Sequence, residues 1–158
     1  MMTFRLAAQA PYKPDWESLD KHKMPSWYED AKIGLSMHWG VYSVPGWAPR
    51  EKGISYAEWY GYRMHEKGNP TVDYHRENYG EKFTYDDFIP MWKAETYDPY
   101  EWAKFAKKMG AKYYFITSKH HDGFCLWPSI YTDRNAMAMG PKKDLLGEFF
   151  KAGRKEGL

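Results

Sequence analysis

Two groups of polar side chains in this sequence could do chemistry, and both contain histidine. His38 and Trp39 form one group, and His120, His121 and Asp122 form the other. Imidazole groups can exchange hydrogen bonds with a ligand, bind a metal ion or transfer a proton. A lone histidine is more often structural, but two such groups at equivalent places in the fold favour a ligand-binding site.

A metal site and a nucleophilic triad are the alternatives. Adjacent histidines on a strand are expected to point to opposite faces, and zinc ligands are usually spaced by a few residues. Cys125 lies near His120 and His121, but no nucleophile signature surrounds it, which favours a buried, inert thiol. We therefore predict no metal and no cofactor.

Glu58 is a carboxylate with two possible roles. It is the fourth residue of the run Ser55-Tyr56-Ala57-Glu58, which fits a capping box at the start of a short helix. Alternatively, its aromatic neighbours, Trp59 among them, would partly desolvate it and favour the protonated form that a general acid needs. The pattern leaves both roles open.

Each histidine group follows a predicted β-strand. Ile33, Leu35 and Met37 alternate with small or polar residues, which predicts a strand that ends at His38. Residues 112–117 are rich in Tyr, Phe and Ile and predict a second strand. In a parallel barrel the large side chains would meet helices, while the small ones and His38 would face inward.

Helices with clear start and stop signals follow the strands. Residues 98–110 begin with an Asp cap and a Pro and end at a Gly, and Phe105 belongs to their apolar stripe. Residues 144–156, with Phe149 and Phe150 on the apolar face, predict a second helix that Gly157 would end.

The order of these elements predicts the fold class. Residues 1–26 are predicted to be an extended lead-in, and residues 39–96 a long irregular connection of the kind that is often functional. Strand, helix, strand and helix in this order are typical of a parallel α/β fold, in which sites form at the carboxyl ends of the strands. If the two strands are neighbours, His38 and His120 lie side by side at one opening.

Composition narrows the classes of protein that remain. The 158 residues are 19% aromatic with a net charge of +2, and the basic residues form no stripe for nucleic acid. One cysteine allows no internal disulfide, and no apolar run reaches membrane-spanning length. The start of the chain carries no clear signal peptide, so a cytoplasmic or a secreted location is open.

Four motifs, in order along the chain, are similar to those of the α-L-fucosidases, glycoside hydrolase family 29. They are the segment Ile33 to Pro45 with its Met-His-Trp-Gly core, Glu58-Trp59-Tyr60, the segment Lys119 to Phe124, and Trp127-Pro128-Ser129. The resemblance covers about residues 14–158. It implies a (β/α)8 TIM-like barrel that hydrolyses terminal α-linked L-fucose in fucosylated glycans or aryl fucosides with retention.

The resemblance also implies roles for single residues. The residues that match His38, His120 and His121 hydrogen-bond the sugar, and the one that matches Trp59 shapes its pocket. Trp39 is a further candidate for sugar binding. The residue that matches Glu58 contacts the sugar and is a candidate acid/base.

The chain departs from the family pattern in its extent. A complete barrel has eight strands, whereas residues 1–158 give a single truncated barrel domain with about two strand–helix units. The family's nucleophile, an Asp after the fourth strand, matches no residue here, which leaves Asp122 as a weak second catalytic candidate. Exposed strand edges predict self-association, for which four copies would close an eight-stranded ring.

Overall fold

The computed structural model describes residues 12–158, which belong to two compact units divided at residues 32 and 33. In the first unit, helix α1 (Trp16–Leu19) is capped by the Asp15 carboxylate, and α2 (Ser26–Asp30) follows after a short turn. The predicted extended lead-in is therefore wrong within residues 12–26, because a capped helical turn interrupts it. Residues 1–11 lie outside the described part.

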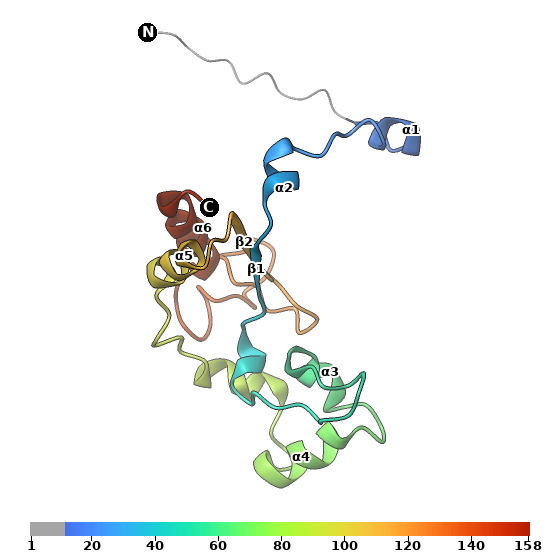
Figure 1. The fold of residues 1–158 in the computed structure, drawn as a ribbon. Coiled ribbons are helices and arrows are strands. Elements are labelled where there is room, and N and C mark those ends of the chain that lie inside the picture. Colours follow the sequence, from blue (N-terminus) through green and yellow to red (C-terminus); the bar gives the residue numbers. More distant parts are fainter. Residues whose placement is uncertain (1–11) are drawn as a thin grey trace. The chain divides into compact units, whose positions relative to one another are not determined.

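The second unit is built on a two-stranded parallel sheet. Strand β1 (Gly34–Met37) pairs with β2 (Tyr113–Ile116), with Gly34 opposite Tyr113 and Met37 opposite Ile116. The predicted adjacency of the two strands is confirmed (Figure 1). Position 34 requires glycine for steric reasons, because the Tyr113 ring occupies the space that a side chain there would need.

Two helices pack against each other beside this sheet (Figure 1). Helix α5 (Pro99–Lys108) begins at Asp98, whose carboxylate accepts hydrogen bonds from two backbone N–H groups. Helix α6 (Leu145–Glu156) begins at Asp144, whose carboxylate accepts one, from the Gly147 N–H. Gly157 ends α6 in the left-handed conformation that glycine adopts without strain. Both helices thus lie where the cap residues predict them.

The two faces of the sheet have different surroundings. Tyr114 faces α6, where its ring stacks on Phe149 at 4.1 Å and its hydroxyl donates to the Phe149 carbonyl oxygen at 2.6 Å. Ser36, His38 and Phe115, on the opposite face, are exposed. The predicted packing of a helix on one face of the sheet is confirmed at Tyr114, whereas the position of His38 inside a closed barrel stays a prediction.

Two aromatic residues of the helices are more exposed than predicted. Phe105 on α5 is 60% exposed, and Phe150 on α6 is 45% exposed. The buried stripes consist instead of Ala103 and Ala106 on α5 and of Phe149 and its neighbours on α6. Phe105 borders an open cavity of about 520 Å³ beside β1, so no described element covers it.

The long connection between β1 and α5 folds into short helices around an aromatic core. Its elements are η1 (Val41–Ser43), η2 (Ala57–Trp59), α3 (Tyr60–Arg63), α4 (Pro70–Tyr79) and η3 (Tyr85–Met91). Rings of Tyr60, Tyr79 and Phe88 pack edge to face in this core. Among residues 12–158, no helix is long and apolar enough to cross a membrane. The described fold is α/β with two strands, which matches part of the predicted barrel.

Candidate functional site

The carboxyl ends of β1 and β2 bring the two histidine groups together. The ring centroids of His38 and His120 are 5.6 Å apart, in an edge-to-face arrangement. At this separation, one monosaccharide could reach both imidazoles through its hydroxyl groups. The predicted adjacency of His38 and His120 is confirmed, whereas their binding of one sugar stays a prediction.

Trp59 completes the cluster from the long connection. Its ring lies 4.0 Å from that of His121 and 5.9 Å from that of His120. Tyr42, on η1, approaches His120 from another side, with ring centroids 5.5 Å apart. We call these five residues, His38, Tyr42, Trp59, His120 and His121, the histidine cluster.

A tight loop after β2 holds His120 and His121 in place. The Leu126 N–H donates to the Ser118 carbonyl oxygen at 2.9 Å and closes the loop. Asp122 stiffens its tip, because one carboxylate oxygen accepts from the Phe124 N–H (3.1 Å) and the other from the Tyr85 hydroxyl (2.8 Å). Both oxygens of Asp122 therefore already serve the loop, which weakens its case as a catalytic group.

The expectation that His120 and His121 point to opposite faces is wrong. Their ring centroids are only 4.8 Å apart. The reason is that β2 ends at Ile116, so the two histidines lie in the loop and the alternation of a strand does not apply to them. Within residues 12–158, no group of three or more His, Cys, Asp or Glu side chains could hold a metal ion. Cys125 is buried, as predicted.

Glu58 does not cap the helix that follows it. The helix η2 begins after Tyr56, and no side-chain hydrogen bond caps it, so the predicted capping box at Ser55 is wrong. Tyr56 takes the cap position because the helical turn starts one residue later than the pattern predicts. Glu58 is half-buried, and its charge acts on both His120 and Tyr42. Its carboxylate is thus near enough to the histidine cluster to act on it electrostatically.

The protonation of the cluster follows from its burial. Burial lowers the pKa of His120 below its ordinary value, and the neighbouring His121 and His38 lower it further, against the opposing charges of Asp122 and Glu58. Burial raises the pKa of Tyr42, and the charges of Asp122 and Glu58 add to this effect. Near neutral pH, His120 is therefore uncharged and the Tyr42 phenol keeps its proton.

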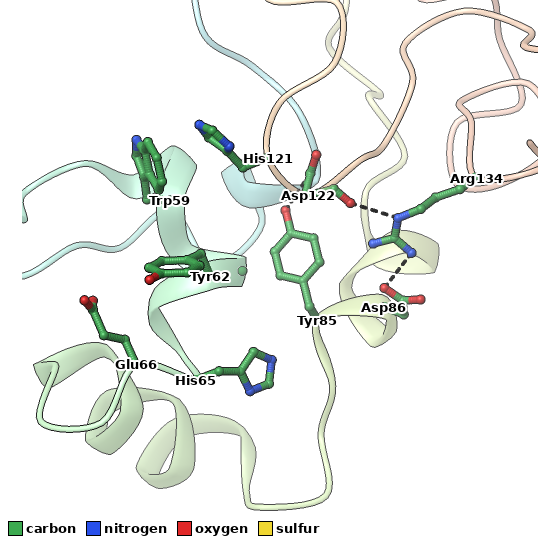
Figure 2. Close-up of a pocket in the computed structure, with 10 residues that line it drawn as sticks. Trp59, Tyr62, His65, Glu66, Tyr85, Asp86, His121, Asp122 and Arg134 are labelled. Atoms are coloured by element: carbon green, nitrogen blue, oxygen red, sulfur yellow. Dashed lines mark hydrogen bonds and ion pairs between the residues drawn. The ribbon is translucent and has the colours of Figure 1, made fainter.

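A cavity of about 590 Å³ opens beside Trp59 and His121, between α3 and the loop after β2 (Figure 2). The Arg134 guanidinium fixes one wall, because it donates to the Asp122 carbonyl oxygen (3.0 Å) and forms an ion pair with Asp86 (2.7 Å). The remaining lining side chains are aromatic or polar: Tyr62, His65, Glu66 and Tyr85. Such a lining suits a polar ligand with apolar faces.

Trp39 contacts the core. Its ring stacks on Tyr97 at 5.0 Å and meets the rings of Trp92 and Trp102 edge to face. Its sugar contact stays a prediction. Sequence reasoning missed Tyr85 and Arg134, whose partners are distant in sequence, and Tyr42, which the first motif contains and which could have been found there.

Comparisons with known proteins agree on one family. The family model described as Alpha-L-fucosidase matches residues 1–158. An alpha-L-fucosidase of Branchiostoma floridae is 44% identical over 147 residues, which cover 92% of this chain and 31% of that protein. The tissue alpha-L-fucosidase of Homo sapiens is 41% identical over 155 residues, 96% of this chain and 32% of that protein.

Solved structures give the same result. The crystal structure of Thermotoga maritima alpha-fucosidase in complex with fucose is 51% identical, with a TM-score of 0.86. The match covers 94% of this chain and 36% of that one. The chain thus spans about a third of the length of the relatives it matches.

Proposed function

Because this chain belongs to the alpha-L-fucosidase family, we propose that it binds the terminal fucosyl group of α-L-fucosides and serves the hydrolysis of that group. His38, His120 and His121 hydrogen-bond the sugar hydroxyls, and Trp59 forms a wall of the pocket. The aglycone is part of a fucosylated glycan, or an aryl group in an assay.

One observation carries this proposal: the imidazoles of His38 and His120 lie 5.6 Å apart at the carboxyl ends of the two strands. A neutral imidazole has one donor and one acceptor, which suits the hydroxyls of a neutral sugar. The ring of Trp59, 4.0 Å from that of His121, offers the apolar face that a sugar ring also needs.

Glu58 is the candidate acid/base of the reaction. It makes no capping hydrogen bond on η2, and its charge acts on His120. In the acid step its proton would pass to the glycosidic oxygen as the bond from that oxygen to the sugar breaks, while a carboxylate other than the family's nucleophile, or a water activated by a base, would bond to the sugar's anomeric carbon. Retention further requires a carboxylate nucleophile about 5–5.5 Å away, and no residue of this chain matches the family's nucleophile.

Binding of L-fucose tests the first half of the proposal. We expect His120→Ala to weaken L-fucose binding about tenfold, because the sugar would lose a hydrogen bond inside a partly buried site. Isothermal titration calorimetry on the full chain measures the change. His22→Ala is the matched control, since His22 is exposed in the first unit. Equal affinities for the two variants would remove His120 from the site.

Binding without turnover is the second candidate function. It is favoured by Asp122, whose two carboxylate oxygens are already bonded to Tyr85 and Phe124. In that case the chain would bind L-fucose but release no phenol from an aryl α-L-fucoside. Release of phenol by the purified chain alone would exclude this alternative.

We further propose that a second copy of this chain, or a chain with the missing strands, covers the open edge of the sheet. Leu35, Met37 and Trp102 line the 520 Å³ cavity beside β1 together with the exposed Phe105. Apolar surface beside an unpaired strand edge favours association. Such a contact would continue the barrel that the family resemblance implies.

Charge at this edge should disrupt the association. We expect Phe105→Asp to raise the dissociation constant of self-association about tenfold, since burial of one large apolar side chain contributes about 1.5–3 kcal/mol. Sedimentation equilibrium measures it. Ile130→Asp is the control, because Ile130 is 88% exposed in a loop away from the strands. A monomeric mass of the unaltered chain at every concentration would contradict self-association.

A further inference from the structure

A third, much smaller cavity is lined by two members of the histidine cluster. Its volume is about 10 Å³, and Tyr42, His120, Asp122 and Thr117 are the side chains with polar groups among its lining. Apolar side chains such as Phe124 complete its wall. Tyr42 is only 5% exposed, so its side of this space is buried.

Two polar atoms at this place have no protein partner within the described residues. They are the hydroxyl oxygen of Tyr42 and Nδ1 of His120, and both atoms are buried. A buried polar atom without a hydrogen bond costs about 1–3 kcal/mol, so two such atoms together are unusual in a stable core. Their rings are 5.5 Å apart, and both line the same small space.

We propose that this cavity binds one internal water molecule, which joins the Tyr42 hydroxyl to Nδ1 of His120. A cavity of about 10–15 Å³ is the smallest that accepts a water, and a buried water needs two to four polar partners. Tyr42 and His120 supply two of these partners. Thr117 and Asp122 line the same cavity and offer acceptors for the second hydrogen of the water.

The protonation of the two rings permits one set of hydrogen-bond directions, which belongs to the proposal. Burial raises the pKa of Tyr42, so its phenol donates to the water oxygen. Burial lowers the pKa of His120, so its ring is neutral and has one acceptor nitrogen. The water donates to Nδ1, and the proton of the ring is held on Nε2.

This water gives Tyr42 a role as a positioning residue. The partner of one imidazole nitrogen fixes the tautomer and thereby the role of the other nitrogen. With its proton on Nε2, His120 donates a hydrogen bond to the sugar and does not accept one. This last step rests on the proposed sugar binding, whereas the water and the tautomer are properties of the ligand-free chain.

The tautomer of His120 tests the proposal directly. In the full chain labelled with ¹⁵N-histidine, at neutral pH and without ligand, long-range ¹H–¹⁵N spectra should show His120 with its proton on Nε2. Loss of one ring system in His120→Gln assigns the signal. We expect Tyr42→Phe to produce a mixture of tautomers and to weaken L-fucose binding about fivefold, the effect of one hydrogen bond of about 1 kcal/mol.

Tyr114→Phe is the matched control. It removes a tyrosine hydroxyl that is hydrogen-bonded to the Phe149 carbonyl oxygen and does not line the small cavity. It should therefore leave the His120 tautomer and the affinity unchanged. A proton on Nδ1 in the unaltered chain, or the same tautomer in Tyr42→Phe, would overturn the proposal. If Tyr42→Phe does not fold, a high-resolution crystal structure of the unaltered chain decides, since density without a water between the two atoms would also overturn it. A correct tautomer without fucose binding would refute only the proposed function.

Discussion

Glu58→Gln is expected to lower the rate of phenol release from phenyl α-L-fucoside at least 100-fold, because general acid catalysis contributes about 10²–10⁴ to such reactions. The glutamine has nearly the same shape but no proton to give to the leaving oxygen. L-fucose affinity should change less than threefold, about the effect of altering one hydrogen bond. Initial rates and calorimetry on the same sample measure both quantities.

The leaving group provides an internal check on the role of Glu58. An acidic 4-nitrophenol needs little protonation as it departs, so its fucoside should lose less rate in Glu58→Gln than phenyl fucoside does. Glu77→Gln is the control, since Glu77 is an exposed carboxylate on α4 that lines neither cavity at the histidine cluster. Rates that stay the same in Glu58→Gln for both fucosides would exclude Glu58 from the mechanism.

Phe149→Ala is expected to lower the free energy of unfolding by about 3–5 kcal/mol, the usual effect of deleting a fully buried phenylalanine. Phe149 is 0% exposed and stacks on Tyr114 of β2. Small domains are stable by about 5–15 kcal/mol, so this change would remove much of the total. Urea unfolding followed by circular dichroism measures the loss.

The next residue of the same helix is the control for this change. Phe150 is 45% exposed, so Phe150→Ala should lower the free energy of unfolding by less than about 1 kcal/mol. The two variants have the same composition and differ only in which face of α6 is altered. Similar losses in both would show that α6 does not pack on β2 through Phe149.

Local signals in the sequence predict the regular elements of this fold well. Asp98 and Asp144 begin helices because their short carboxylates reach the free N–H groups of the first turn, and Gly157 ends one because it adopts positive φ. The parallel pairing of β1 and β2 follows from the order of the elements. The adjacency of His38 and His120 is a consequence of that pairing.

The errors lie in irregular segments, where spacing does not determine direction. The rule that adjacent side chains diverge holds only inside a strand, so it fails for His120 and His121 in their loop. Ser55 matches a capping pattern, but the helix starts one residue later. The hydrogen bond from Tyr85 to Asp122 joins residues 37 positions apart, and no periodicity marks either partner.

That same hydrogen bond cannot form until the ribosome has synthesised the chain as far as Asp122. Tyr85 leaves the ribosome well before Asp122, and Trp59 and His38 leave earlier still. A nascent chain that ends after α5 therefore carries His38 and Trp59 without the loop that supplies His120 and His121. On the proposed function, affinity for fucose would therefore arise only after translation has passed β2 and the loop that carries His120 and His121.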